Sequence, residues 1–424
     1  MPKKTIQLSD HFTYSRLLRF VLPCIGTMLF TSIYGIVDGL CVSNFVGKTA
    51  FAAVNLIMPL PMLLGTIGFM LGTGGSAIVG ITLGEGDQKK ADRYFTLFLL
   101  AALVSVSVLA VLGIVFLRPI AVLLGAKGEL LDYAVRYGRI LMVSLPTFAL
   151  QNMFQSFFVT AEKPHLGFWF TVGAGCTNMV LDVLMVGIWG WGVEGAAIAT
   201  FISQLVGGVL PVFYFIDRSN SSRLHLCKTS FYSKVLRDAC INGSSELMTN
   251  LSMSLVNILY NFQLLRLAGE NGVAAYGVIM YAAFLFVAVF VGYAVGSAPI
   301  VSFHYGARNH AEVHNLYRKS LRLIAVVAVT LTLASMFIIP CVARVFVGYD
   351  AELLALTSRA FRLYALSFLI MGFNVYASSF FTALGDGVTS ALISFLRTLL
   401  FQLAALLLLP ALWGIDGVWL AVTA

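Results

Sequence analysis

The sequence has few charged residues. Asp, Glu, Lys and Arg make up only 11% of its 424 residues, whereas a soluble domain carries about 25%. Apolar residues account for 59% and fall in long runs, such as 97–117 and 399–412, near the roughly 20 residues that cross a bilayer. The runs lack the alternation of barrel strands. The chain is therefore predicted to be an all-α polytopic membrane protein, and this excludes a soluble enzyme, a nucleic-acid binder, a secreted disulfide scaffold and a β-barrel.

The sequence also lacks paired cysteines and a cleavable leader. Its six cysteines form no C-x-x-C pair and lie mostly in apolar stretches, as small packing residues do. Residues 1–20 carry four basic side chains but no short apolar stretch followed by a small-residue cleavage site. We expect an amphipathic segment that leads into the first helix on the cytoplasmic side, not a signal peptide.

Twelve membrane-spanning helices fit the apolar runs. Short linkers rich in Gly, Asp and Asn separate them, including 84–87 and 269–272, and these are turn-forming residues. The spans are predicted at about 17–41, 51–83, 91–117, 130–157, 165–188, 193–216, 235–265, 273–305, 315–340, 352–381, 387–410 and from 414 onward.

The basic residues predict the orientation of these helices. If the N-terminus is cytoplasmic, 17 of the 27 Lys and Arg residues fall on that side and nine on the other, and Arg397 lies inside a span. Cytoplasmic loops are enriched in Lys and Arg. We therefore expect a multi-pass protein of the inner (cytoplasmic) membrane with its N-terminus in the cytoplasm.

The two halves of the chain are related by a shift of 222 residues. The shift places 47–53 on 269–275 and 192–195 on 414–417, with matching glycines and alanines. An even number of crossings gives parallel repeats. We predict an N-terminal lobe at 1–216, a cytoplasmic linker at 217–234 and a C-terminal lobe at 235–424, which face each other around a central cavity. Such a plan is typical of alternating-access transporters, and by comparison with the sixth helix the twelfth is expected to be incomplete at the end of the chain.

Two carboxylates lie inside predicted spans of the first lobe, where an ionisable residue costs about 2.5 to 3.5 kcal/mol. Asp38 is in the first helix on a stripe with Tyr34, and Asp182 is in the fifth, one turn after Asn178. Burial and a neighbouring carboxylate both disfavour the charged form, so such a pair is expected to hold a proton; the same oxygens suit Na⁺ equally well. The alternative is that each Asp only bonds a neighbour. Tyr260 takes the place of Asp38 in the second lobe, which concentrates ion chemistry in the first.

The fourth and seventh helices carry candidate substrate contacts, and Tyr34 of the first helix is a further candidate. Met153, Phe154 and Gln155 lie in a stretch that mixes apolar and amide side chains, which suits flat organic cations through cation–π contacts and adaptable packing. Glu246, near the start of the seventh helix, either meets a cationic substrate or lies at the membrane interface. The alternative for each aromatic is that it faces lipid or another helix.

The chain resembles the multidrug and toxic compound extrusion (MATE) family over nearly its whole length. The resemblance rests on the duplicated plan, on Val37-Asp38-Gly39, on Thr160-Ala161-Glu162-Lys163-Pro164, on Asn178 with Asp182, and most specifically on Gly190-Trp191-Gly192-Val193-Glu194-Gly195-Ala196-Ala197-Ile198-Ala199-Thr200. It implies a monomeric, non-enzymatic transporter that exports small organic cations, drugs among them, in exchange for H⁺ or Na⁺, without another cofactor.

The same resemblance assigns roles to particular residues. Asp38, Asn178, Asp182 and Thr200 match the first-lobe cation site, which would hold Na⁺ if that is the coupling ion. Glu246 resembles a carboxylate of helix 7 in bacterial members. The acid that some members carry in helix 10 is Asn374 here, which weakens the expectation of an ion site in the second lobe.

Two other functions remain open from the residues alone. A lipid-linked oligosaccharide flippase has a similar helical plan but needs a strongly cationic cavity, and Arg397 is the one clear base within a span. A membrane-embedded transferase or hydrolase needs a His, Cys or Asp cluster near the membrane surface, and no cluster with plausible spacing is found in the sequence.

Overall fold

A computed structural model describes residues 6–348 and 350–423, and every regular element within them is a helix. The elements of the first half are α1 (Tyr14–Phe45), α2 (Lys48–Ile57), α3 (Pro59–Gly84), α4 (Gln88–Leu123), α5 (Glu129–Thr160), α6 (Pro164–Asp182), the π-helix η1 (Val183–Ile188), α7 (Gly192–Gln204), the π-helix η2 (Leu205–Val209) and α8 (Leu210–Ile216). The second half contains α9 (Ser233–Asn242), α10 (Ser244–Gly306), α11 (His310–Val347), α12 (Ala351–Ala365), α13 (Phe368–Ala383), α14 (Gly387–Phe395), the π-helix η3 (Leu396–Phe401), α15 (Gln402–Trp413) and α16 (Ile415–Leu420).

A helix is found at each predicted span, but three spans differ in detail. The predicted span 51–83 is divided into α2 and α3, because a new helix begins at Pro59, and proline favours the first turn of a helix. The span at 352–381 is bent by 47° between α12 and α13. The seventh span, predicted at 235–265, is divided at Gly243 between α9 and the start of α10. Further along α10 the backbone leaves helical geometry at Gly269, where φ is 60°, within the linker predicted between the seventh and eighth spans.

Most of these helices are long and apolar enough to cross a membrane. By length and composition, eight of the described helices qualify, and a ninth is added if α12 and α13 form one bent span. The long α5 is more polar, and its Gln151, Asn152 and Ser156 are buried. Its polar side therefore faces the interior of the protein, not lipid.

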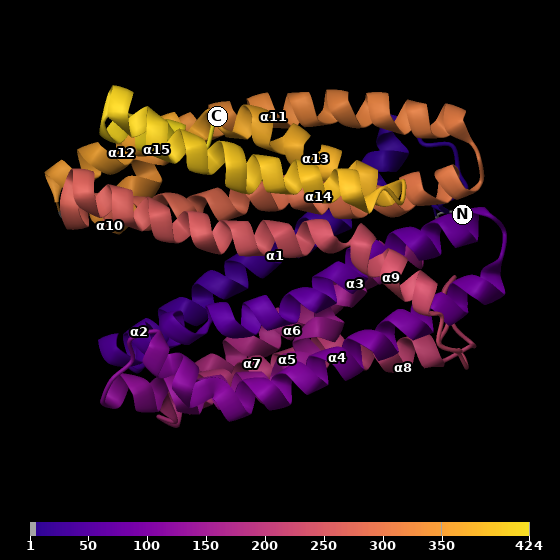
Figure 1. Ribbon diagram of the computed structural model, residues 1–424, viewed down its shortest axis with the longest axis horizontal. Helices are drawn as coiled ribbons and strands as arrows, with labels where there is room; N and C mark the ends of the chain where they lie inside the picture. Colours follow the sequence, from indigo (N-terminus) through magenta and orange to yellow (C-terminus); the bar gives the residue numbers. More distant parts are fainter. Residues whose placement is uncertain (1–5, 349, 424) are drawn as a thin grey trace.

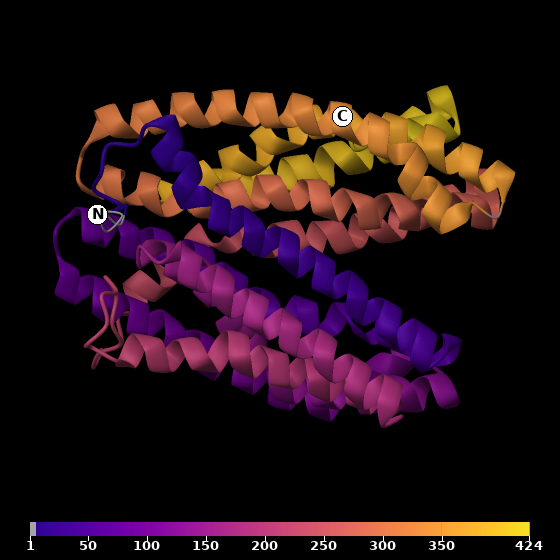
Figure 2. The ribbon, with the colours of Figure 1, turned by 180° about the vertical axis from the view of Figure 1, so that it is seen from behind.

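The two halves form two adjacent layers of helices (Figure 1). The first half, α1 to α8, occupies the lower layer in that view and α10 to α16 the upper one. Between them, α1 and α3 pack against α10, and α1 also packs against α6. Figure 2 shows α1 crossing diagonally from the start of α11 in the second half towards the far end of the first half. This helix therefore contacts both layers.

The backbone repeats the internal duplication. Gly86 and Arg308, which are 222 residues apart, both follow a long helix with positive φ, of 87° and 55°. Gly192 and Gly414, also 222 apart, precede α7 and α16 with φ of 60° and 57°. Positive φ is uncommon for residues other than glycine, and glycine occupies three of these four positions. Its recurrence at the same spacing supports the predicted plan of two six-helix repeats.

The two halves touch backbone to backbone where α3 and α10 end. A Cβ added to Gly84 would lie 2.0 Å from the carbonyl oxygen of Phe303, and one added to Gly306 would lie 2.0 Å from that of Ile81. One turn earlier, Gly80 faces the Cβ of Ser302. Only glycine permits these approaches, so this end of the interface is closed.

The N-terminal segment, residues 6–13, bridges the halves at the same end. The backbone N–H of Leu8 donates to Glu162, just after α5, at 2.9 Å, and that of Phe12 donates to Glu312, in the first turn of α11, at 2.9 Å. Leu8 and Phe12 are fully buried. The segment thus ties the last turn of α5 to the first turn of α11.

Candidate cation site and central cavity

Two carboxyl groups meet where α1 packs against α6. Asp182 is the last residue of α6 and is fully buried, and its carboxyl group lies within hydrogen-bonding range of that of Asp38. Neither oxygen of Asp182, nor Oδ1 of Asp38, has a donor in the part of the chain that the structure describes. Two adjacent carboxylates repel each other, so the pair needs a shared proton or a cation between its oxygens.

An amide and a hydroxyl group lie beside this pair. Asn178, one turn before Asp182, is buried and its Nδ2 donates to Oγ1 of Thr200 on α7 at 3.5 Å. The Oδ1 atom of Asn178 accepts nothing within the described residues. The structure therefore brings the four residues predicted for the cation site, on α1, α6 and α7, into one oxygen-rich cluster.

Two features of this cluster were not predicted. Tyr137 of α5 is fully buried, its hydroxyl has no partner among the described groups, and it lies within electrostatic range of both Asp38 and Asp182. The π-helix η1 begins directly after Asp182, and π turns are frequent at functional sites. Tyr34, predicted as a substrate contact, also lies close enough to Asp38 to feel its charge, so it belongs to this cluster.

A cavity of about 670 Å³ lies between the two halves. The first half contributes Ser76 of α3 and Ser156 of α5 to its wall. The second half contributes residues of α10, of the elements from α12 to α15, and of 421–423. Pockets for small molecules are commonly about 300–1,000 Å³. The predicted central cavity therefore exists and has the size of a small-molecule site.

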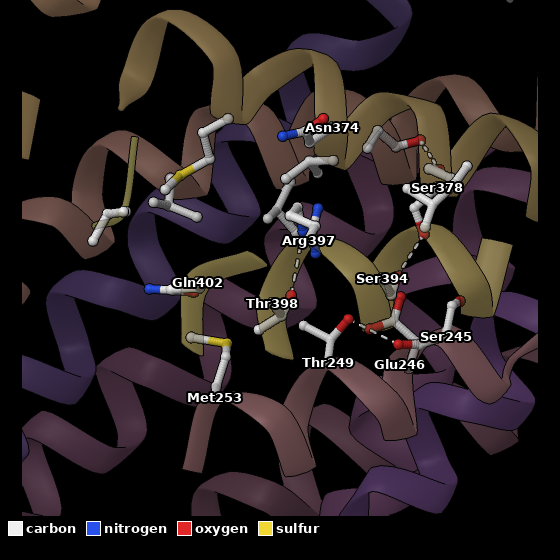
Figure 3. Close-up of a pocket in the computed structure, with 18 of the residues that line it drawn as sticks. Ser245, Glu246, Thr249, Met253, Asn374, Ser378, Ser394, Arg397, Thr398 and Gln402 are labelled. Atoms are coloured by element: carbon white, nitrogen blue, oxygen red, sulfur yellow. Dashed lines mark hydrogen bonds between the residues drawn. The ribbon is translucent and has the colours of Figure 1, made fainter. Parts of the chain in front are cut away.

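One acid and one base are the charged residues among those that line the cavity. Glu246 extends from the start of α10, and Arg397 extends from η3 on the opposite wall (Figure 3). Each is within electrostatic range of the other, but the two side chains form no ion pair within the residues described. Nε of Arg397 donates to Oγ1 of Thr398 at 3.3 Å, whereas its buried Nη1 has no acceptor among those residues.

The other four predicted substrate contacts divide between three places. Glu246 lines the large cavity. Met153 and Phe154 do not: both are buried in the core of the first half, and the Phe154 ring stacks on Phe215 with centroids 5.5 Å apart. Gln155 lines a separate narrow pocket between α1 and α5. The polar side of α5 reaches the large cavity through Ser156, one residue further along.

Comparison with known proteins gives one family and several relatives. A family model described as MatE matches residues 23–184 and 247–406. The multidrug export protein MepA of Staphylococcus saprophyticus is 20% identical over 408 residues, which cover 96% of this chain and 89% of that protein. MepA of Staphylococcus aureus strain MSSA476 is 21% identical over 407 residues with the same coverage.

Solved structures share the fold. A crystal structure of MATE in complex with MaL6 superposes with a TM-score of 0.92 at 23% identity, covering 99% of this chain and 94% of that chain. A transporter of the MOP superfamily from Pyrococcus furiosus, described as having a binding pocket of reverse polarity, gives 0.91 at the same identity and coverage. The two-lobed arrangement seen here is thus that of solved transporter structures.

Proposed function

Since the chain belongs to the MatE family of multidrug efflux transporters, we propose that it is a secondary active antiporter that exports organic cations in exchange for H⁺ or Na⁺. The observation that carries this proposal is the pair of carboxyl groups of Asp38 and Asp182, three of whose four oxygens are buried without a donor among the described residues. The cavity between the lobes is the proposed substrate site, and the substrate leaves it chemically unchanged. The relatives named for multidrug export support this class of substrate.

The cation site is proposed to bind one coupling ion or two. Exchange of one monovalent cation for one H⁺ moves no net charge, so a pH difference alone drives it, at about 1.4 kcal/mol per unit. A membrane potential contributes about 2.3 kcal/mol per charge per 100 mV. Two carboxylates allow two ions to enter per cycle, which adds this electrical contribution. Asn178 and Thr200 supply further oxygens for either ion.

The closed end of the interface is proposed to face the cytoplasm of a bacterial inner membrane. The linker 217–232 lies at this end, where Arg223 stacks on Phe303, and it carries three basic residues that favour the cytoplasmic side. Arg16 and Arg19 follow the N-terminal segment in α1. The described state is then one whose cavity is closed to the cytoplasm. A single chain contains both lobes and the cavity, so we propose that the monomer is the working unit.

Export of a fluorescent organic cation from cells tests the proposal, with a pH gradient or a Na⁺ gradient imposed separately. Asp182→Asn keeps the size of the side chain but removes its charge. We expect one of the two gradients to drive export by the wild type, and we expect this export to be lost in Asp182→Asn. Asp132→Asn, at an exposed position on α5, is the matched control and is expected to transport normally. Export by Asp182→Asn at the rate of the control would reject the proposed cation site.

The flippase hypothesis is less well supported. It requires several bases for a pyrophosphate group, whereas the residues lining the cavity include one base and one acid. If the cation assay shows no export, uptake of a lipid-linked oligosaccharide is the next assay.

A further inference from the structure

The cavity contains a positive charge that export of simple cations does not use. We propose that Arg397 binds the anionic group of the substrate, so that the cavity selects amphipathic zwitterions, compounds with a carboxylate as well as a cationic centre. This inference rests on the proposed function and specifies its substrate class. Glu246 is then the partner of the cationic centre.

The guanidinium group of Arg397 lacks the acceptors it needs. Arginine stays charged in proteins and presents five donors, and a buried charged donor without a partner is costly. Here Nε of Arg397 donates to the uncharged hydroxyl oxygen of Thr398, and Nη1 is buried with no acceptor among the described residues. Glu246, the acid among the residues that line the cavity, makes no ion pair with Arg397. A ligand carboxylate would supply the missing acceptors, because its two oxygens match the guanidinium fork.

The helix that carries Arg397 is locally widened. Residues 396–401 form the π-helix η3 within the span that runs from α14 to α15, and such turns often mark functional sites. Figure 3 shows the Arg397 side chain pointing into the cavity between Asn374 and Thr398. Apart from Glu246, which forms no ion pair with Arg397, the cavity-lining residues are uncharged, so the groups beside the guanidinium offer only neutral oxygens.

The two charges of the cavity complement a molecule that carries both signs. Glu246 and Arg397 both extend into the cavity (Figure 3), and the residues that line it also include Met253, Tyr276 and Met371. Thioether and aromatic side chains suit a flat apolar body. A simple cation would gain from Glu246 but be repelled by Arg397, whereas a zwitterion pairs with both. The acid and the base together therefore favour the zwitterion.

A matched pair of dyes separates the two substrate classes. Rhodamine 6G is a cationic ester, and its free acid has the same ring system with a carboxylate. Purified protein in liposomes is given the ion gradient that supports export, and transport of each dye is compared for the wild type, Arg397→Gln and Arg397→Lys. Arg362→Gln, at an exposed position on α12, removes the same charge outside the cavity and serves as the control.

We expect the wild type to transport both dyes and Arg397→Gln to lose transport of the free acid by about tenfold or more, as for loss of a hydrogen bond between charged groups. Transport of the ester should be retained or increased, because Arg397→Gln also removes the repulsion of a simple cation, and this shows that the variant is folded. Arg397→Lys should retain part of the free-acid transport. Equal loss of both dyes, no loss of either, or a wild type that moves only the ester would overturn the inference.

The experiment also distinguishes this inference from the proposed function. If the wild type moves neither dye, export of organic cations fails as a function. Binding of the free acid to the purified protein, followed by fluorescence polarisation, then decides the role of Arg397. Tighter binding of the free acid than of the ester, lost in Arg397→Gln, would support it, and equal binding of the two dyes would reject it.

Discussion

Removal of the Glu312 carboxylate is expected to open the interface between the lobes at its closed end. This side chain attaches the N-terminal segment to α11 together with Lys319, whose Nζ donates to the carbonyl oxygen of Phe12 at 2.6 Å. Its Oε1 accepts from the backbone N–H of Phe12 at 2.9 Å and from Nδ2 of Asn315 at 2.9 Å, and its Oε2 lies 2.6 Å from Nδ1 of His11. Asn315 belongs to α11 itself, so two of the three contacts hold the segment to the second lobe.

The size of the effect follows from these two contacts. A hydrogen bond to a charged group contributes about 1.5 to 3 kcal/mol, and neighbouring contacts are not additive. Glu312→Ala is therefore expected to destabilise the attached segment by about 3 kcal/mol, which corresponds to roughly a hundredfold change in an equilibrium. The equilibrium for separation of the lobes changes by this full factor only if the segment must detach each time the lobes separate.

Maleimide labelling of a cysteine at position 302 measures this separation. Ser302 is fully buried against Gly80 in the closed interface, so in a variant without the six native cysteines its labelling rate reports how often the interface opens. We expect Glu312→Ala to raise the rate by up to about a hundredfold. Glu352→Ala removes an exposed acid from the first turn of α12 and should leave the rate unchanged. Equal rates in both variants would refute the role given to the segment.

Three further predictions concern single positions. Gly84→Val places a side chain where even a Cβ would lie 2.0 Å from the carbonyl oxygen of Phe303, so it should prevent the closed state and raise labelling at the interface; normal labelling would contradict the described contact. Arg308→Gly should stabilise the protein and raise its melting temperature, because a non-glycine residue at positive φ costs about 1 kcal/mol. Gly86→Ala should destabilise the protein by a similar free energy and lower its melting temperature. A reversed order of the two melting temperatures would count against the paired turns. Tyr137→Phe removes a buried hydroxyl that lies near the carboxylate pair and has no partner among the described groups. Because this hydroxyl is available to bond the ion-bound pair, its loss should reduce ion-driven export about three- to tenfold, as for one hydrogen bond formed on ion binding, without reducing the amount of folded protein; unchanged export would remove Tyr137 from the site.

The sequence predicts the positions and order of the helical spans but not their interruptions. Apolar runs and the 222-residue shift reveal the spans and the duplication, because both depend on composition along the chain. The break before Pro59 lies within an apolar stretch, so hydropathy does not detect it, although the proline itself is a visible signal. The π turns after Asp182 and around Arg397 leave no comparable mark, since a change from i+4 to i+5 hydrogen bonding needs no particular residue type.

The sequence likewise identifies some residues of the candidate site and not others. Asp38 and Asp182 can be identified from the sequence because a carboxylate within a span is costly and therefore rare. Tyr137 cannot, since tyrosine is common in this chain and its approach to the pair depends on how α5 packs. Phe154 shows the opposite error: an aromatic side chain gives the same sequence signal whether it lines a cavity or, as here against Phe215, fills a core.

The arrangement of α1 indicates how ion binding in one lobe can affect a cavity walled mainly by the other. Asp38 pairs with Asp182 within the first half, whereas both charged residues of the cavity belong to the second half. Of the helices that position the carboxylate pair, α1 is the one that also packs extensively on α10, the helix that carries Glu246. From Tyr14 to Asp38 it rises about 36 Å, so it links the carboxylate pair to the N-terminal segment at the closed end. A change in charge at Asp38 that alters the packing of α1 would therefore act on the cavity wall and on the closed end through the same helix.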